Sequence, residues 1–397
     1  MQIDRAALYE RVWQKPMTSL AASFGISDVA LKKKCLKAKI PVPERGYWAK
    51  VQAGKKVGKL ALTERPPGMS RIVYIGETRY RRSIPSDEEI LATIPESPTY
   101  DQTLDDIEAK ITAAVGKLCL IRSLDAVHPA VGKLLSADDT RREKQAASRY
   151  SYAWDAPLFD GPFEVRRLRI LNTLFRTAVK FGGTGDIRGQ RGREISLSIY
   201  DTHVWLGVDT PANLKKDPRY ANWDKTDARS KMRLIIRSNW SGDELFAWED
   251  SERSKVEDHL STILVNVIVT AEKTLRSQEL HQHSCWLERR ESIFAARRKA
   301  LQEAERQRLE LIERQRQASI DTLLGQAAAL HQADTIRALV ERAKAEKCDE
   351  DAKAFKRWSD WALGVADGLD PLRSTGLFNA FEFEPAASGE SDTDGLD

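Results

Sequence analysis

Residues 17–36 read MTSLAASFGISDVALKKKCL, and this stretch decides how the N-terminal part of the chain is interpreted. The pattern predicts a short helix over 18–24, a turn at Gly25 and a second helix over 27–36. Gly25 stands where the backbone must enter the left-handed region, which costs glycine least. Ser27 is a favourable N-cap for the second helix. The residues expected to pack between the two helices are Leu20, Ala21, Phe24, Ile26 and Leu31.

The residues before this pair predict a third helix. Residues 4–13 are amphipathic, with Leu8, Val12 and Trp13 opposite charged side chains. Lys15-Pro16 ends this helix, because proline lacks an amide donor and clashes with the preceding turn. The first 60 residues are therefore expected to contain a small trihelical bundle.

This bundle is strongly basic. Residues 1–60 contain 13 Lys and Arg but only 4 Asp and Glu, a net charge of +9. The whole chain carries +4, so residues 61–397 carry −5. A basic head on a mildly acidic body favours neutralisation of phosphates, which supplies most of the non-specific affinity of proteins for DNA.

The first 50 or so residues resemble the helix-turn-helix DNA-binding superfamily through the paired helices of 17–36. The resemblance implies that the second helix enters the major groove of double-stranded DNA and reads bases with its N-terminal part. The superfamily usually has an apolar residue at the position of Lys34, so Cys35, one turn after Leu31, is the expected buried residue instead. The residues that the resemblance places at or near DNA are Ser27, Asp28, Val29, Lys32 and Lys33.

The segment after the second helix carries further candidates. Residues 40–50, IPVPERGYWAK, cannot begin as a helix, because each proline biases its predecessor toward extended backbone. Two interpretations are open: an extended arm that places Arg45 in a narrow minor groove, or a segment whose Tyr47 and Trp48 fold back onto the bundle. Phosphate contacts that read no sequence are expected from Lys50, Lys55, Lys56 and Lys59.

The chain as a whole is predicted to be mainly α with a small α+β domain. Its hydrophobic content of 41% and charged content of 31% fit a soluble, helix-rich protein. The expected parts are a helix-turn-helix head over 1–59, a Pro-rich linker over 60–101, a helical connector over 102–162, an α+β domain over 163–250, a long coiled-coil-like helix over 251–317, C-terminal helices within 318–375, and an acidic, disordered tail over 376–397.

Within the α+β domain, alternating apolar residues predict four strands of a central antiparallel sheet, backed by a helix over 165–181. The strands are expected over 195–199, 204–208, 232–236 and 245–248. The glycine-rich residues 182–185 are interpreted as a helix stop and turn, and the charged residues 138–148 as exposed. The long helix must pack on something, so either a hairpin with the C-terminal helices or association through 251–317 with a second copy or a partner protein is expected.

Catalytic patterns are sparse, and no cofactor is expected. The phosphate-binding G-x-x-x-x-G-K-[ST] pattern does not occur in the sequence. His281, His283 and Cys285 resemble a metal cluster, but on a helix only His281 and Cys285 share a face, and structural zinc usually takes four ligands. No metal site is therefore expected there. The enzyme alternative is a metal-dependent DNA nuclease whose carboxylates converge from strand ends at Asp201, Glu249 and Asp250.

The leading hypothesis is a cytoplasmic DNA-binding protein with no membrane partner. No apolar run is long enough to span a bilayer, the first residues lack an apolar signal core, and the four cysteines show no paired spacing. A bacterial transcription regulator and an accessory factor of a mobile-element or defence system are both open. The alternatives are the nuclease and a coiled-coil scaffold whose basic head binds protein.

Overall fold

The computed structural model describes residues 1–76, 85–149, 156–189, 191–216, 226–239, 241–347 and 352–373. The chain divides into two compact units, Met1–Arg290 and Glu291–Asp397. Its fold is mainly α with a small α+β part, as the sequence predicts.

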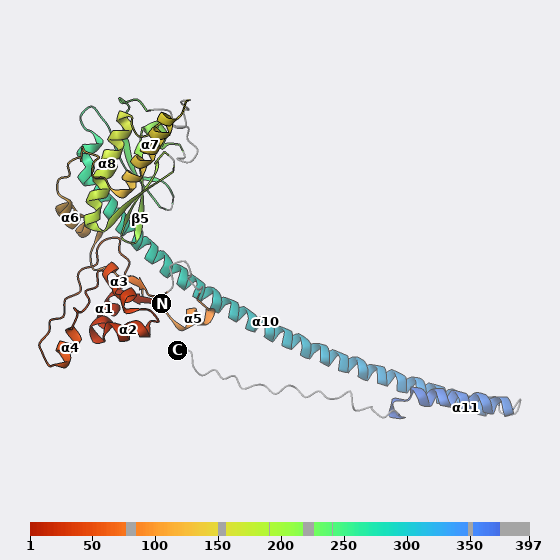
Figure 1. Cartoon of the computed structure of the whole chain (residues 1–397). Helices are drawn as coiled ribbons and strands as arrows, with labels where there is room; N and C mark the ends of the chain where they lie inside the picture. The colour runs from red at the N-terminus through yellow and green to blue at the C-terminus, as the bar shows by residue number, and fades with distance from the viewer. Residues whose placement is uncertain are drawn as a thin grey trace. The chain divides into compact units, whose positions relative to one another are not determined.

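Three helices form the N-terminal head of the first unit (Figure 1). They are α1 (Arg5–Gln14), α2 (Met17–Ser23) and α3 (Asp28–Lys37). The Asp4 carboxylate caps α1 by accepting hydrogen bonds from the amides of Ala6 and Ala7. A two-stranded sheet completes the head, in which β1 (Gln2–Asp4) pairs antiparallel with β2 (Ile72–Tyr74).

The α+β part of the first unit is a five-stranded antiparallel sheet in the order β3-β4-β5-β6-β7. Its inner face shares one apolar core with α8 (Pro162–Ala178) and with the first turns of α10 (Leu260–Lys347) (Figure 1). The strands are β3 (Gly183–Arg188), β4 (Glu194–Ile199), β5 (Thr202–Asp209), β6 (Arg233–Arg237) and β7 (Glu244–Glu249).

Strand β3 is absent from the sequence prediction, which interprets residues 182–185 as a helix stop and turn. Gly182 does end the short 3-10 helix η2 (Val179–Phe181) with φ of +74°. Gly183 and Gly185, however, already belong to β3. A Cβ at these positions would lie 2.6 Å from the Ala178 Cβ and 2.2 Å from the Phe175 ring, respectively. The glycines are therefore explained by the close approach of α8, which no local pattern indicates.

Residues 138–148 are mostly exposed, as expected, and residues 138–147 lie in α7 (Pro129–Ala147), but Asp138 is the exception because it is fully buried. The Asp138 carboxylate accepts hydrogen bonds from the amides of Leu158 and Phe159 and pairs with Arg141 at 2.5 Å. A buried carboxylate with these partners is satisfied. The remaining short helices of the first unit are α4 (Tyr47–Gln52), α5 (Asp87–Ala92), α6 (Leu104–Val115), α9 (Pro211–Leu214) and the 3-10 helix η3 (Val256–His259).

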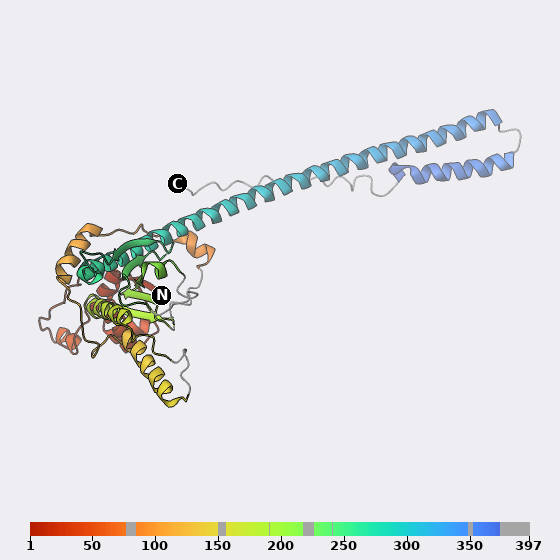
Figure 2. The ribbon, with the colours of Figure 1, turned by 90° about the horizontal axis from the view of Figure 1, so that it is seen from above.

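Helix α10 continues to Lys347, whereas the sequence predicts a long helix to 317 and separate helices beyond it. Gly325 lies in its interior without ending it. In the second unit, α11 (Ala352–Leu369) runs antiparallel beside the last turns of α10, and the 3-10 helix η4 (Pro371–Arg373) follows (Figure 2). The described residues of this unit therefore contain the hairpin that was one of the two predicted ways of packing the long helix.

The hairpin is held by small side chains and one arginine. Ala333 and Val340 of α10 and Ala362 and Ala366 of α11 are buried. Arg337 Nη2 lies 2.6 Å from an Asp370 carboxylate oxygen and 3.1 Å from one of Asp367. The close approach of the alanine faces and the pairing of Arg337 with the buried Asp370 together hold the hairpin.

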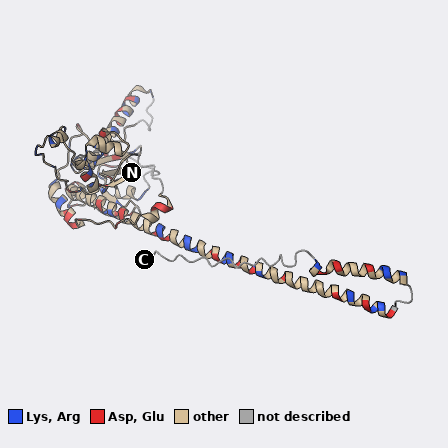
Figure 3. Cartoon of the chain, turned by 90° about the horizontal axis from the view of Figure 1, so that it is seen from below, with Lys and Arg blue, Asp and Glu red and all other residues tan. Residues whose placement is uncertain are grey.

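Along the rest of α10 in the second unit, positive and negative side chains are intermixed (Figure 3). Arg306 pairs with both Glu303, at 3.3 Å, and Glu310, at 3.5 Å. Pairs at this spacing support a solvated helix. Across the described ranges, no helix combines the length and apolar character required to cross a bilayer.

Candidate nucleic-acid interface

A tight turn joins α2 to α3. The amide of Gly25, with φ of +66°, donates to the Ala22 carbonyl, and the amide of Ile26 donates to the Ala21 carbonyl, both at 3.1 Å. These bonds satisfy carbonyls at the end of α2. Ser27 Oγ then accepts a hydrogen bond from the Ala30 amide at 3.2 Å and caps α3. The predicted roles of Gly25 and Ser27 in the turn are confirmed.

The rotation of α3 about its axis follows from two buried residues, Leu31 and Cys35, which are both fully inaccessible. Lys34, between them, is partly exposed. The structure therefore confirms Cys35 as the second core position. Burial raises the pKa of the Cys35 thiol to about 11, so the thiol stays protonated and acts as a small apolar side chain.

The outer face of α3 is a stripe formed by Val29, Lys32, Lys33 and Leu36, at helical spacings of three and four residues. Val29 is 58% exposed and Leu36 is 56% exposed, and both lysines are exposed as well. Within the described ranges, neither lysine ammonium forms an ion pair or hydrogen bond. We call these four residues the α3 stripe. It presents two positive charges and two apolar side chains to solvent.

Arg5 anchors the C-terminal end of α3, a role that the sequence does not indicate. Its side chain is buried, and it donates hydrogen bonds to the carbonyls of Ala38 at 2.8 Å and Lys39 at 2.9 Å. Burial, together with the nearby Arg65, lowers the pKa of Arg5. A cation that bonds the last carbonyls of a helix stabilises its C-terminus. Arg5 thus ties the start of α1 to the end of α3.

The C-terminal end of α3 faces the turn between β4 and β5. Lys37 Nζ lies 3.9 Å from an Asp201 carboxylate oxygen, and Lys34 and Lys37 line a shallow cleft with Met69, Ser70 and Asp201. The α3 stripe itself remains exposed to solvent.

The segment after α3 folds back rather than extending as an arm. Tyr47 packs edge-on against Trp13, with 5.2 Å between ring centroids, and Trp13 Nε1 donates to the Pro41 carbonyl. Gly46, with φ of +85°, precedes α4. Of the two predicted arrangements, the aromatic cap is therefore the one observed. Arg45 and Lys50 are nevertheless exposed on this segment.

Lys59 differs from the other predicted phosphate ligands. Its ammonium lies 2.9 Å from the Glu10 carboxylate and 4.4 Å from the centroid of the Tyr9 ring. The hydrogen bond to Glu10 raises the pKa of Lys59. This lysine holds the chain onto α1, so its charge is already partly compensated. Lys55 and Lys56 are exposed.

The loop between α4 and β2 is fastened to α10 by Glu272, whose side chain is fully buried. Arg65 Nη2 lies 2.5 Å from Glu272 Oε1, Arg276 Nε lies 2.8 Å from it, and the Gly68 amide donates to Oε2 at 2.8 Å. Burial by itself raises the pKa of Glu272, but these hydrogen bonds outweigh it and lower the pKa. A Cβ on Gly68 would lie 2.8 Å from the Ile199 carbonyl oxygen, so only glycine fits.

The carboxylates of the nuclease hypothesis are not brought together. Asp201 lies just before the first residue of β5. Glu249 of β7 pairs with Arg233 of β6, which in turn pairs with Asp209, the last residue of β5. Asp201 and Glu249 are therefore level with opposite ends of β5. At about 3.3 Å per residue, this register separates Asp201 from Glu249 by roughly 25 Å. Asp250 is buried and already accepts hydrogen bonds from Arg166, Met232 and Val256. The convergence predicted from strand ends is thus wrong for these three residues.

No other acidic or metal-ligand cluster replaces them in the part of the chain that the structure describes, where no group of three His, Cys, Asp or Glu has metal-site geometry. His281 and Cys285 share a face of α10, with Cys285 Sγ 3.6 Å from His281 Nε2. His283 points elsewhere, and its Nε2 lies 3.1 Å from the Pro95 carbonyl oxygen. The predicted orientation of the three side chains is confirmed.

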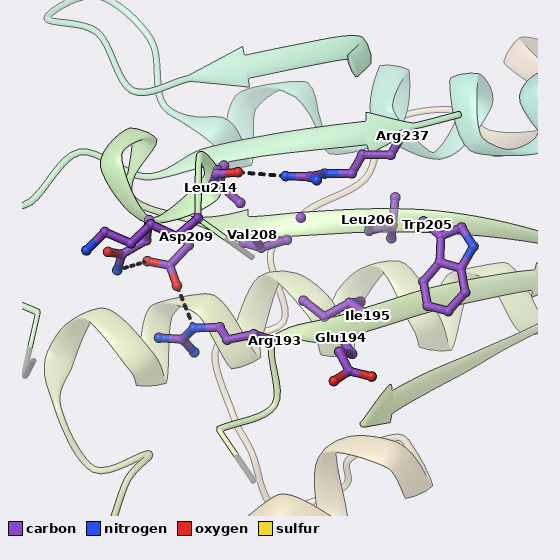
Figure 4. Close-up of a pocket in the computed structure, with 12 residues that line it drawn as sticks. Arg193, Glu194, Ile195, Trp205, Leu206, Val208, Asp209, Leu214 and Arg237 are labelled. Atoms are coloured by element: carbon purple, nitrogen blue, oxygen red, sulfur yellow. Dashed lines mark hydrogen bonds and ion pairs between the residues drawn. The ribbon is translucent and has the colours of Figure 1, made fainter. Parts of the chain in front are cut away.

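A cleft of about 180 Å³ lies against β5 and α9, between Trp205 and Asp209 (Figure 4). Arg237 at its edge donates to the Leu214 carbonyl at 2.7 Å. Asp209 accepts from the Asn213 side chain at 2.9 Å and pairs with Arg193 at 2.5 Å. The Asp209 carboxylate and the Arg237 guanidinium of this cleft are therefore bound to other groups of the chain, and we assign them to holding α9 on the sheet.

The chain was compared with protein-family models, curated proteins and solved structures, and nothing matches it. The interpretation of the α3 stripe therefore depends on its geometry and charge.

Proposed function

We propose that this protein binds double-stranded DNA through α3, with the α3 stripe against the major groove. The observation that carries the proposal is that Lys32 and Lys33 are exposed and unpaired, within the described residues, on the second helix of a helix-turn-helix layout. The head that presents them has a net charge of +9 over residues 1–60. Exposed cations on a helix that fits the groove are the arrangement that phosphate neutralisation requires.

The residues of α3 divide by the kind of DNA contact that they favour. Asp28 and Val29 lie at the N-terminal end, the part of a recognition helix that meets base edges. A carboxylate accepts from the cytosine amino group, and an apolar side chain such as that of Val29 contacts the thymine methyl group. Ser27 Oγ accepts the capping hydrogen bond from the Ala30 amide, so its hydroxyl proton stays available to donate to DNA. Lys32 and Lys33 bind phosphates.

A second group of contacts comes from the folded-back segment. Arg45 and Lys50 are exposed beside and on α4, and we propose that they bind the phosphate backbone without reading sequence. The segment is folded onto Trp13 and is therefore not an extended arm that could place Arg45 in a minor groove.

The proposed cellular role is that of a cytoplasmic DNA-binding factor, either a transcription regulator or an accessory protein of a mobile-element or defence system. The scaffold alternative is favoured by the exposed leucines of α10 in the second unit, including Leu301 and Leu309. The two roles are compatible if the second unit assembles copies whose heads bind DNA.

A titration with labelled duplex tests the proposal. The full chain is added to a fluorescein-labelled duplex pool of random sequence, and anisotropy is followed at several salt concentrations. We expect binding at low salt, with an affinity that falls linearly on a log–log plot by about 0.9 per phosphate neutralised. An affinity that is independent of salt, or no binding at about 20 mM salt, would contradict the proposal.

A further inference from the structure

Helix α11 has two apolar faces, and α10 covers only one of them. Ala362 and Ala366 are buried against α10. A second line of apolar side chains follows heptad-like spacing along another side of α11 and stays exposed. Trp361 is 66% exposed, Trp358 36% and Leu372, just past the helix in η4, 63%. We call this line, with Val365 and Leu369, the outer stripe.

Two exposed tryptophans make a large patch for a helix of 18 residues. At roughly 150–250 Å² per buried aromatic side chain, the accessible parts of these two indoles together equal about one whole tryptophan. Contiguous apolar surface of this kind, which none of the described residues covers, is typical of an interaction site. The outer stripe also contains no charged residue.

Two glycines, Gly364 and Gly368, lie within α11, and the packing of the hairpin explains neither of them. A Cβ built on either residue meets no atom within 4 Å. Both have ordinary helical φ, so no left-handed backbone requires glycine. Glycine inside a helix is less stable than alanine. A pair of glycines four residues apart allows the backbone of another helix, or a large side chain, to approach closely.

Trp358 lies in the N-terminal half of α11, Trp361 lies at its middle, and both glycines lie in its C-terminal half. If two copies of α11 pair antiparallel, Trp358 of each copy lies opposite Gly368 of the other, and Trp361 lies opposite Val365. Both pairs are centred on the same position, Leu363, so a single two-fold axis satisfies them together. Parallel pairing would instead place tryptophan against tryptophan and glycine against glycine.

The helix dipoles favour the same alignment, because antiparallel pairing opposes them. Lys356 and Arg357 lie near the start of α11, so in an antiparallel pair these cations of each copy lie beside the C-terminal, negative end of the partner's helix dipole. The Asp367 and Asp370 carboxylates near that end are already paired with Arg337 of their own hairpin. We propose that the occupant of the outer stripe is a second copy of this chain, which forms a two-fold dimer through α11.

The assembly state of the purified full chain tests this inference without DNA, so its outcome is independent of the proposed DNA binding. Sedimentation equilibrium is expected to give twice the chain mass of 44.8 kDa at micromolar concentrations. The substitution Gly368→Leu fills the space proposed for Trp358 of the partner. It is expected to weaken the dimer at least tenfold, although it raises helix propensity and a Cβ at this position meets no atom within 4 Å in its own hairpin.

Gly325→Leu is the matched control, because Gly325 is also helical and a Cβ on it also meets nothing within 4 Å. This variant is expected to remain dimeric. The double variant Trp358→Glu/Trp361→Glu is expected to be monomeric with unchanged helix content by circular dichroism. A monomeric wild-type chain at about 100 μM would overturn the inference. Equal dimerisation of the Gly368→Leu and Gly325→Leu variants, or a dimer that survives both tryptophan substitutions, would overturn it too.

Discussion

Replacement of both Lys32 and Lys33 by alanine is expected to weaken binding of duplex DNA by the full chain about 10–100-fold near physiological salt. The two ammonium groups are exposed on the outer face of α3 and, within the described ranges, bind no other side chain. Each therefore has a full charge available for one phosphate. Loss of two such contacts should also reduce the slope of log affinity against log salt by about 1.8. Anisotropy titrations of wild type and variant across a salt series measure both quantities.

The matched control is the variant Lys299→Ala/Lys344→Ala, which removes two exposed lysines of α10 in the second unit. It changes the net charge equally, so it separates loss of a specific contact from loss of overall positive charge. We expect its affinity to stay close to that of the wild type. If the two double variants lose the same amount of affinity, α3 is not the element that contacts DNA.

Glu272→Leu is expected to have the largest effect on the first unit. The substitution leaves the Arg65 and Arg276 guanidinium groups and the Gly68 amide without their buried acceptor, and removal of one partner of a buried pair typically costs about 3–5 kcal/mol. Residues 63–76 should consequently detach from α10. Hydrogen exchange followed by mass spectrometry is expected to show loss of protection in this segment by roughly 10²–10⁴-fold.

Glu64→Gln is the control for this variant, because Glu64 pairs with Lys110 in an exposed position at 3.2 Å. An exposed pair contributes about 0–1 kcal/mol, so little change is expected. If Glu272→Leu and Glu64→Gln show the same protection, the buried acceptor does not hold the segment.

The same cluster predicts the direction of a pH effect. The pKa of Glu272 is lowered in the folded protein, so its stabilising contribution is complete above the ordinary glutamate pKa of 4.5. It is lost as the pH falls from that value through the lowered pKa. Protection of residues 63–76 should therefore decrease in acid and be insensitive to this group at neutral pH.

The local parts of the fold were predictable from the sequence because their causes are local. A glycine turn, a serine cap and a proline break each act within four residues, and they define the three helices of the head. The burial of Cys35 is predictable because this residue lies one turn from Leu31. Alternating apolar residues likewise indicated four of the five strands.

The remaining features depend on residues that are distant in sequence. Gly183 and Gly185 indicate a turn until the approach of Phe175 is known. Asp138 lies in a charged stretch that predicts an exposed side chain. It is buried because it accepts hydrogen bonds from amides that lie 20 and 21 residues away. Glu272 and Arg65 are separated by 207 residues. Such satisfied charges carry no local signal, and the separation of Asp201 from Glu249 likewise requires the register of β5 and β6.

Part of the candidate interface could also be anticipated. Lys32, Lys33, Arg45 and Lys50 are exposed, as a solvent-facing interface requires. The compensation of Lys59 by Glu10 was not visible, because the two residues lie 49 positions apart. The anchoring of α3 by Arg5 has no local signal either, because an arginine in a basic segment resembles a DNA contact until its buried carbonyl partners are known.

Lysine footprinting tests the central claim most directly. The full chain is treated briefly with an amine-acetylating reagent, free and saturated with duplex, and modification of each lysine is measured by mass spectrometry. We expect Lys32 and Lys33 to react in the free protein and to be strongly protected by DNA, while Lys299 and Lys344 react equally in both states. Saturation with duplex that leaves Lys32 and Lys33 as reactive as in the free protein would contradict DNA binding through α3.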